Sequence, residues 1–340
     1  MILLEKESTA SLLAGAKALV QAHYADLAKA GPGDVAMVLA RRMAPGALWR
    51  GMRPFYEQTG PKAVAETFWS PFLRAFSRVQ RREDIFFAGQ NTVGPGTWTC
   101  SMGHLMGLFD APFIGIRPTG KLAMLRYAEF NRIEDGQITE TALFVDILHL
   151  MAQAGITPLQ GQTAAELVQP GPRTHDGLLY GPQAPEAGAK TMALIDRMIG
   201  SINFVNSVGN PPTPQEELAE NWHDDMCWWG PTGIGATFTI DRYIAQHQGP
   251  FRHKTKDREF NGHLARFSEG NYGGFFGWPN LSVIPVGDYM GLPASGIRAP
   301  MRVVDVYRRE GDKLAENWIF IDILHFLSEQ GVDLLADLNA

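Results

Sequence analysis

Cysteine is scarce in this 340-residue chain, and neither sign of charge is in large excess. Only Cys100 and Cys227 are present, too few for a disulfide framework, so we expect two ordinary thiols of a cytoplasmic protein. The formal net charge is -6, with 30 Lys and Arg against 36 Asp and Glu. This balance argues against an overall electrostatic surface for nucleic acid or for an anionic membrane.

Long apolar runs are also missing. Charged residues interrupt every hydrophobic stretch before it reaches the roughly 20 residues that span a bilayer. The N-terminus carries Glu5 and Glu7 where a signal peptide needs a basic start and an unbroken apolar segment. Hydrophobic residues make up 45% and charged residues 19%, which is typical of a globular protein. We therefore expect a soluble protein with no membrane partner.

The motifs of cofactor enzymes and metalloenzymes are not found. The glycines of 94–96 and 273–274 lack the residues that a phosphate or dinucleotide loop requires. No His-Glu-x-x-His, paired-cysteine or Gly-x-Ser-x-Gly pattern occurs. The sequence therefore predicts neither a cofactor nor a metal site.

The chain contains an internal repeat. Residues 120–132 align without a gap on 296–308, and the register continues as Glu140–His149 falls on Glu316–His325. Upstream landmarks recur in the same order, among them Trp49-x-Gly51 and Trp228-x-Gly230. A fixed offset of this kind predicts two copies of one structural module.

A Pro/Gly-rich stretch separates the copies. We expect a first domain over 1–160, a linker over 161–187 that passes over the surface, and a second domain over 188–340. Each copy opens with a long helix and a short one, the second short helix being capped by Thr213. Alternating apolar residues then predict strands, with Asp135-Gly136 and Gly311-Asp312 as hairpin turns. The fold class is α+β, with an antiparallel sheet in each half. The predicted strands are 97–100, 122–133, 137–145, 263–267, 302–308 and 313–321.

The order of these motifs resembles the SnoaL-like polyketide cyclases of the nuclear transport factor 2-like superfold. In the first half the resemblance rests on Gly115-Ile-Arg-Pro-Thr-Gly-Lys121, the hairpin, and an Asp that leads into a short helix ending at Gly155. The second half has Trp228-Trp-Gly-Pro231 and Glu316-x-Trp318-x-x-x-Asp322. The resemblance implies two tandem cone-shaped α+β barrels, each a curved antiparallel sheet wrapped around a long helix. It also implies an apolar pocket and an internal pseudo-dimer, and it leaves homo-oligomers open.

The last strand of each copy suggests a pocket wall. Period-two alternation puts Glu316, Trp318, Phe320 and Asp322 on one face of the second copy, with Asn317, Ile319 and Ile321 on the other. The equivalent face of the first copy is Glu140, Ala142, Phe144 and Asp146. We expect the acid-bearing face to line the pocket.

The family resemblance implies that an Asp near the end of this strand acts as acid and base in an intramolecular aldol closure. The matching position is Asp322, with Asp146 as its twin, and His325 and His149 follow each acid by three residues. The predicted function is a cofactor-independent aldol-type cyclase or isomerase, of the lyase or isomerase class, acting on a small apolar carbonyl compound. The alternative is a non-catalytic module of the same fold that binds a small molecule or supports assembly.

Each candidate residue also has a structural interpretation. Asp146 and Asp322 stand where an Asp caps a helix, and each histidine can simply pack on the first turn. Trp228, Trp278 and Trp318 can stack on a planar substrate or belong to the core. The pairs Arg126/Glu129 and Arg302/Asp305 recur together, and we interpret them as ion pairs at the surface or between the copies.

Overall fold

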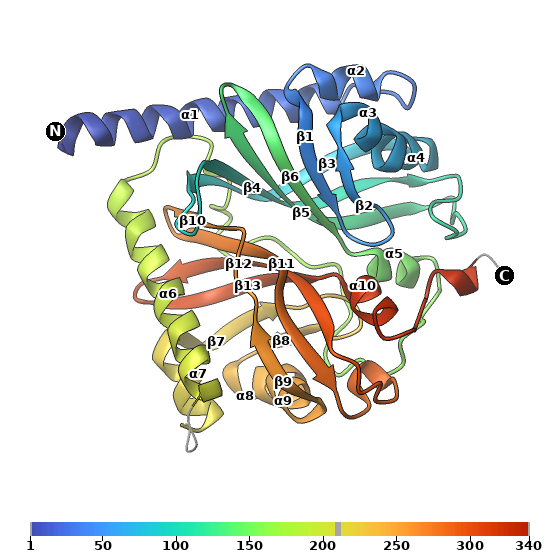
Figure 1. Ribbon diagram of the computed structural model, residues 1–340, viewed down its shortest axis with the longest axis vertical. Coiled ribbons are helices and arrows are strands. Elements are labelled where there is room, and N and C mark those ends of the chain that lie inside the picture. The colour runs from blue at the N-terminus through green and yellow to red at the C-terminus, as the bar shows by residue number, and fades with distance from the viewer. Residues whose placement is uncertain (1, 208–211, 339–340) are drawn as a thin grey trace. The chain divides into compact units, whose positions relative to one another are not determined.

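The computed structural model describes residues 2–207 and 212–338, and the chain divides into two compact units. The first unit comprises Met1–Thr157, Arg173–Pro182 and Asp322–Ala340. The second comprises Pro158–Pro172 and Gln183–Ile321. Figure 1 labels the helices and strands of both units, which are described one after the other below.

The first unit is a six-stranded sheet with the long helix α1 against it. The strands run in the order β2-β1-β6-β5-β4-β3, and α1 contacts β3 and β4. Short helices connect β2 to β3, and α5 follows β6. The elements are α1 (Ile2–Leu27), α2 (Val35–Ala40), β1 (Met43–Gly51), β2 (Tyr56–Thr59), α3 (Gly60–Val64), the π-helix η1 (Ala65–Trp69), α4 (Ser70–Ala75), β3 (Phe76–Gln90), β4 (Thr97–Phe109), β5 (Leu122–Glu134), β6 (Gln137–Val145), α5 (Ile147–Gln153), α10 (Ile323–Ser328) and η4 (Ala336–Leu338).

The second unit repeats this order of elements. Its sheet runs β10-β11-β12-β13-β7-β8, with β9 paired to β11, and helix α6 contacts β10 and β11. The elements are α6 (Pro185–Ser207), α7 (Pro214–Asn221), β7 (Trp222–Trp229), β8 (Ala236–Phe238), α8 (Ile240–Tyr243), the π-helix η2 (Ile244–Gln248), α9 (Gly249–Lys254), β9 (Thr255–Phe260), β10 (Ala265–Glu269), β11 (Tyr272–Pro285), η3 (Tyr289–Gly291), β12 (Ala299–Glu310) and β13 (Lys313–Ile321).

Local chemistry explains several of these boundaries. Asp135 and Gly136 both have positive φ, 49° and 71°, as the two-residue turn between β5 and β6 requires. Helix α7 begins with a capping box, in which the Thr213 hydroxyl accepts from the Glu216 N–H and the Glu216 carboxylate accepts from the Thr213 N–H. The α+β class is confirmed.

The pairing of the sheets differs from the expectation in one respect. The strands β1 and β6 are parallel, and so are β7 and β13, while the other pairs in both sheets are antiparallel. The turn signals in the sequence mark hairpins, which join antiparallel neighbours. A pair whose strands are far apart in the sequence carries no turn signal, so its direction could not be predicted.

The Pro/Gly-rich segment is bonded into both units. Ala165 exchanges backbone hydrogen bonds with Ala236 of β8. Farther along, Phe86 of β3 donates to Gly177 and accepts from Leu179. These bonds satisfy backbone groups of the segment at the two sheets, while most of its residues remain at least partly exposed.

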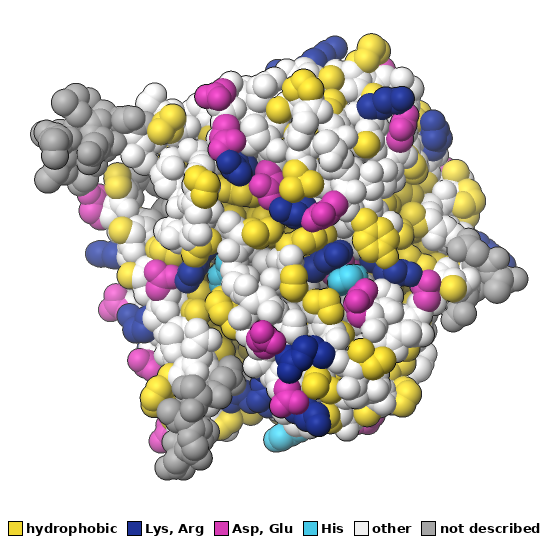
Figure 2. All heavy atoms as spheres, in the orientation of Figure 1, with side chains coloured by type: hydrophobic (Ala, Val, Ile, Leu, Met, Phe, Trp, Pro, Cys, Tyr) yellow, Lys and Arg dark blue, Asp and Glu magenta, His cyan; other side chains and the backbone are white. Residues whose placement is uncertain are grey.

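Basic and acidic side chains alternate on the face of the molecule in Figure 2, where dark blue and magenta atoms are interspersed. No helix in the described part of the chain is both long and apolar enough to cross a membrane.

Candidate functional site in the second unit

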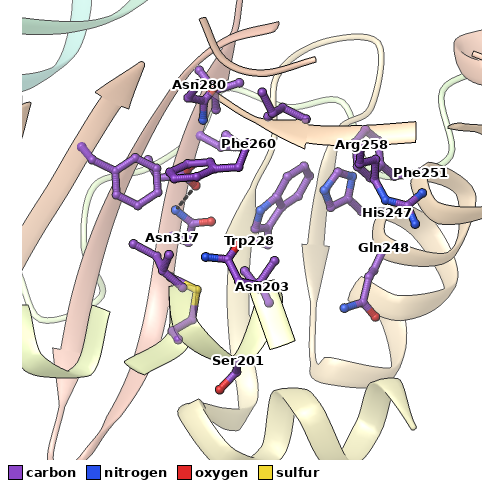
Figure 3. Close-up of a pocket in the computed structure, with 18 of the residues that line it drawn as sticks. Ser201, Asn203, Trp228, His247, Gln248, Phe251, Arg258, Phe260, Asn280 and Asn317 are labelled. Atoms are coloured by element: carbon purple, nitrogen blue, oxygen red, sulfur yellow. Dashed lines mark hydrogen bonds between the residues drawn. The ribbon is translucent and has the colours of Figure 1, made fainter. Parts of the chain in front are cut away.

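The second unit encloses a cavity of about 330 Å³ between its sheet and its helices. Three cross-strand pairs of β12 and β13 form its floor: Val303 with Ile321, Asp305 with Ile319, and Tyr307 with Asn317. Residues of α6, α7, η2 and β9 complete the walls. Figure 3 shows Trp228 and His247 facing each other across from Asn317 and Phe260. The volume suits a small organic molecule.

Asp305 is the buried acid of this cavity. Its side chain is 8% exposed, and its Oδ1 accepts a hydrogen bond of 3.0 Å from Asn317 Nδ2, the dashed line in Figure 3. Burial raises the pKa of Asp305 to about 7, and hydrogen bonds from Asn317 and Tyr307 oppose this rise only in part. Both protonation states of the carboxyl group are thus accessible near neutral pH.

The other two carboxylates of the described lining are paired with arginines. Glu217 is 5% exposed and accepts two bonds from Arg252 Nη2, at 3.0 and 2.8 Å. Glu259 forms an exposed ion pair with Arg298 at 3.2 Å. Asp305 accepts from neutral side chains instead, and these bonds offset only part of the effect of burial, so its charged form stays disfavoured.

Two stacked pairs of rings contribute to the walls. The rings of Trp228 and His247 lie 3.9 Å apart at an angle of 18°, and those of His263 and Phe275 lie 3.9 Å apart at 14°. Burial lowers the pKa of both histidines to about 3, with Arg266 adding to the effect on His263. Both rings are neutral at pH 7, so the cavity offers flat, uncharged surfaces.

The predicted pocket face of the last strand is the wrong face. The cavity is lined by Asn317, Ile319 and Ile321, whereas Glu316, Trp318, Phe320 and Asp322 are not in its lining. Glu316 instead accepts a 2.5 Å bond from Arg308, and Trp318 Nε1 donates to the Pro170 carbonyl at 3.0 Å. The prediction of which residues share a face was correct, but the cavity was assigned to the wrong face. Aromatic and apolar residues occupy both faces of this buried strand, so their pattern does not distinguish the two.

The repeated aspartates cap helices. Asp146 Oδ1 accepts from the His149 N–H at 3.0 Å, at the start of α5. Asp322 is completely buried and accepts from the His325 N–H at 3.2 Å and from the Arg53 N–H at 3.0 Å. These bonds hold both acids as helix caps. The histidines His149 and His325 are buried beside them and are not in the lining of the cavity.

Of the predicted aromatic residues, Trp228 lines the cavity and is 2% exposed. Trp278 is half-buried outside the lining, where the Arg302 guanidinium lies over its ring at 4.1 Å. Phe144 is completely buried in the first unit. Only Trp228 among the predicted site residues therefore contributes to this cavity.

The sequence contained one indication that Asp305 is a buried acid, but we interpreted Asp305 as the partner of Arg302. The interpretation of Arg302/Asp305 as an ion pair is wrong, since Arg302 stacks on Trp278 and Asp305 accepts from Asn317. Asp305 interrupts the apolar run Val303–Tyr307. A single acid within such a strand points to a buried carboxyl group, because charged residues are rarely buried without a specific reason.

Comparison with known proteins finds a family that is similar to the first unit. Residues 19–154 match the model of the SnoaL-like polyketide cyclases. The match extends from the second half of α1 to the end of α5. It agrees with the resemblance that the sequence of the first copy predicted. No curated protein matches the chain.

Solved structures similar to this chain include two NTF2-like proteins. One, from Burkholderia xenovorans, is 10% identical and covers 42% of this chain and 97% of its own, with a TM-score of 0.33. The other, from Burkholderia thailandensis, is 20% identical over 41% of this chain and 95% of its own, with a TM-score of 0.32. IdmH of Streptomyces antibioticus, suggested to be a polyketide cyclase, is 16% identical over 40% of this chain and 98% of its own, with a TM-score of 0.32.

The interior of the first unit contains stacked phenylalanines where the second unit has its cavity. Phe68 of η1 occupies the place that His247 has in η2, and it contacts Trp49, Phe55 and Phe72 with ring centroids 5.0 to 5.9 Å apart. The cluster continues through Phe113, 5.8 Å from Phe72.

The acid of the first unit is also held differently. Glu129 falls on Asp305 in the sequence repeat, and its carboxylate accepts from Arg81 at 2.9 Å and from Asn131 at 3.1 Å. The side chains of Arg81 and Glu129 are 10% and 4% exposed. The Arg126/Glu129 pair expected from the sequence is therefore wrong, because Arg81 of β3 is the partner of this acid.

Proposed function

We propose that the second unit is a second SnoaL-like domain and a cofactor-independent acid/base enzyme. Its substrate would be a small apolar carbonyl compound, and its reaction an aldol-type cyclisation or an isomerisation. The preferred acid/base is Asp305 rather than Asp322. The observation that carries this proposal is a buried carboxyl group with a pKa of about 7 inside an apolar cavity.

The chemistry needs only groups that the cavity contains. The Asp305 carboxylate accepts a proton from the carbon next to a carbonyl group, which leaves an enolate. In a cyclisation the enolate carbon attacks a second carbonyl of the same molecule, a C–C bond forms, and the Asp305 carboxyl returns the proton to the new alkoxide. In an isomerisation the proton returns to another carbon. Tyr243 lines the cavity, and burial raises its pKa, so its hydroxyl remains a donor for the oxyanion.

The apolar walls supply the remaining part of catalysis. Neutral rings of Trp228 and His247 present flat surfaces on which an unsaturated or aromatic substrate can stack. Holding two carbonyl groups of a flexible molecule close together lowers the barrier, by roughly 7 to 11 kcal/mol in favourable cases.

A proton-exchange assay tests the role of Asp305 without knowledge of the natural substrate. We expect the protein to accelerate α-deuteration of 1-tetralone in D₂O, measured by mass spectrometry, above the rate in buffer. Asp305→Asn should abolish this acceleration, and Asp322→Asn should retain it, because Asp322 is a cap outside the lining. Loss of exchange in folded Asp322→Asn with retention in Asp305→Asn would overturn the assignment.

The natural ligand can be sought in the same preparation. Small molecules extracted from the purified protein and identified by mass spectrometry should include an apolar compound with at least one carbonyl group. Consistent recovery of a compound without a carbonyl, together with no exchange of 1-tetralone, would instead support a carrier.

A non-catalytic role is the second candidate, and it is favoured for the first unit. There the acid is in a buried ion pair with Arg81, and phenylalanines stack in the interior. The ion pair holds this carboxylate in a fixed contact inside the unit. We propose that this unit contributes stability or assembly, including the pairing of the two copies as a pseudo-dimer, rather than turnover.

A further inference from the structure

The first unit has a cavity of its own next to its phenylalanine cluster, with Phe76, which stacks on Phe72, in the lining. It has a volume of about 300 Å³ and lies between the end of α1, the helices η1 and α4, and the start of β3. Three basic side chains line it, those of Lys29, Arg78 and Arg81. The described lining contains no Asp or Glu. An excess of one charge in a cavity favours a ligand of the opposite charge.

Arg81 is fixed in this cavity before any ligand binds. Its guanidinium lies 3.7 Å from the centre of the Tyr24 ring and 4.6 Å from that of Tyr127. Its Nη2 donates to Glu129 at 2.9 Å, and its Nη1 makes no hydrogen bond of ordinary geometry. A planar guanidinium held between rings loses little conformational freedom when it binds an anion.

Two acids near the lining are already paired with arginines, and a third, Asp110, accepts from the hydroxyl of the lining residue Ser77. Glu129 lies beyond the lining and neutralises only one of the three cations. Asp26, near the end of α1, forms ion pairs with Arg41 and Arg42. The carbonyls of Tyr24, Asp26 and Leu27 at the end of α1 accept bonds from the N–H groups of residues 28–30. The negative end of the helix dipole is therefore partly satisfied.

Apart from Tyr24 and Ser77, the rest of the lining is apolar. Leu27, Trp69, Leu73, Phe76 and Leu105 surround the basic groups. An inorganic anion would leave these surfaces without contacts, whereas an aromatic or acyl body would cover them. We infer that the first unit binds a small carboxylate with an apolar body, its carboxylate directed at the basic groups.

A matched pair of probes tests this inference on the full-length protein. Isothermal titration calorimetry with 4-bromobenzoate and with the neutral 4-bromobenzyl alcohol separates the contribution of charge from that of the ring. We expect the carboxylate to bind more tightly than the alcohol. Crystals soaked with 4-bromobenzoate should show the anomalous signal of bromine in the first-unit cavity.

The variants remove charge without disturbing the core. Lys29 and Arg78 are exposed, so the double variant Lys29→Gln/Arg78→Gln should fold normally. The double variant should bind 4-bromobenzoate about tenfold or more weakly, while its affinity for 4-bromobenzyl alcohol should not change. Arg74→Gln removes an exposed charge outside the lining and should have no effect. Equal binding of the two probes, unchanged affinity in the double variant, or bromine only in the second-unit cavity would each refute the inference.

Discussion

Asp305→Asn should stabilise the second unit, and the gain should grow as the pH rises. Burial holds the folded-state pKa of Asp305 at about 7, against an ordinary value of 3.8. The folded state therefore retains a proton that the unfolded state releases between these two values, so stability falls as the pH increases through this window. A neutral asparagine of the same shape does not undergo this loss.

The size of the effect follows from the two pKa values. A difference of about 3 units corresponds to roughly 4 kcal/mol once the pH exceeds 8, because each unit contributes 1.36 kcal/mol. Of this total, about 2.5 kcal/mol should develop between pH 5 and pH 8. The variant and the wild type should converge as the pH approaches 4, where the carboxyl group is neutral in both states.

Urea unfolding at intervals from pH 5 to pH 8 measures the difference, with wild type and variant compared at each pH so that other titrating groups cancel. Because the chain has two units, hydrogen exchange of peptides from β12 and β13 should accompany it and report on the second unit alone. Asp224→Asn, at an exposed position of β7, is the matched control for the change of charge. Parallel stability curves for Asp305→Asn and wild type across this range would refute the account of Asp305 as a carboxyl group destabilised by burial.

Three further substitutions test the contacts around the sites. Arg252→Met leaves the Glu217 carboxylate buried without its partner, and we expect a loss of roughly 3 to 5 kcal/mol in urea unfolding, which Arg252→Lys should partly restore. Thr213→Ala removes half of the capping box and should cost about 1 kcal/mol, whereas Thr213→Ser should be neutral. Lys17→Met removes the bonds from its Nζ to the Leu179 and Gly181 carbonyls, so amides of 177–181 should exchange faster with solvent while those of β12 stay protected.

The sequence predicted those parts of the fold whose causes are local. The hairpin at Asp135-Gly136 and the cap at Thr213 were found because each depends on residues a few positions apart. The strand predicted over 137–145 has these bounds in the structure, and the one predicted over 313–321 does too. The parallel pairs of β1 with β6 and β7 with β13 depend on residues about 90 positions apart, and periodicity contains no information about them.

The site was predicted less well for a different physical reason. The two-residue periodicity of a strand predicts which side chains share a face, but it does not predict which face lines a cavity. In β13 both faces are buried, with Trp318 on one and Ile319 on the other, so burial alone cannot choose between them. The choice is made by η2 and α9, which cover the Asn317 side of the sheet and leave a cavity there.

The comparison of the two acids shows which feature decides the chemistry of a unit. Glu129 and Asp305 hold equivalent positions, and both are almost fully buried. The difference lies in the partners: a buried arginine beside Glu129, and the neutral Asn317 and Tyr307 beside Asp305. Arg81 holds Glu129 in a buried ion pair, whereas amide and hydroxyl donors orient the Asp305 carboxyl group while burial still favours its protonated form. The counter-charge, rather than the presence of the acid, is thus what separates a unit suited to proton transfer from one suited to structure.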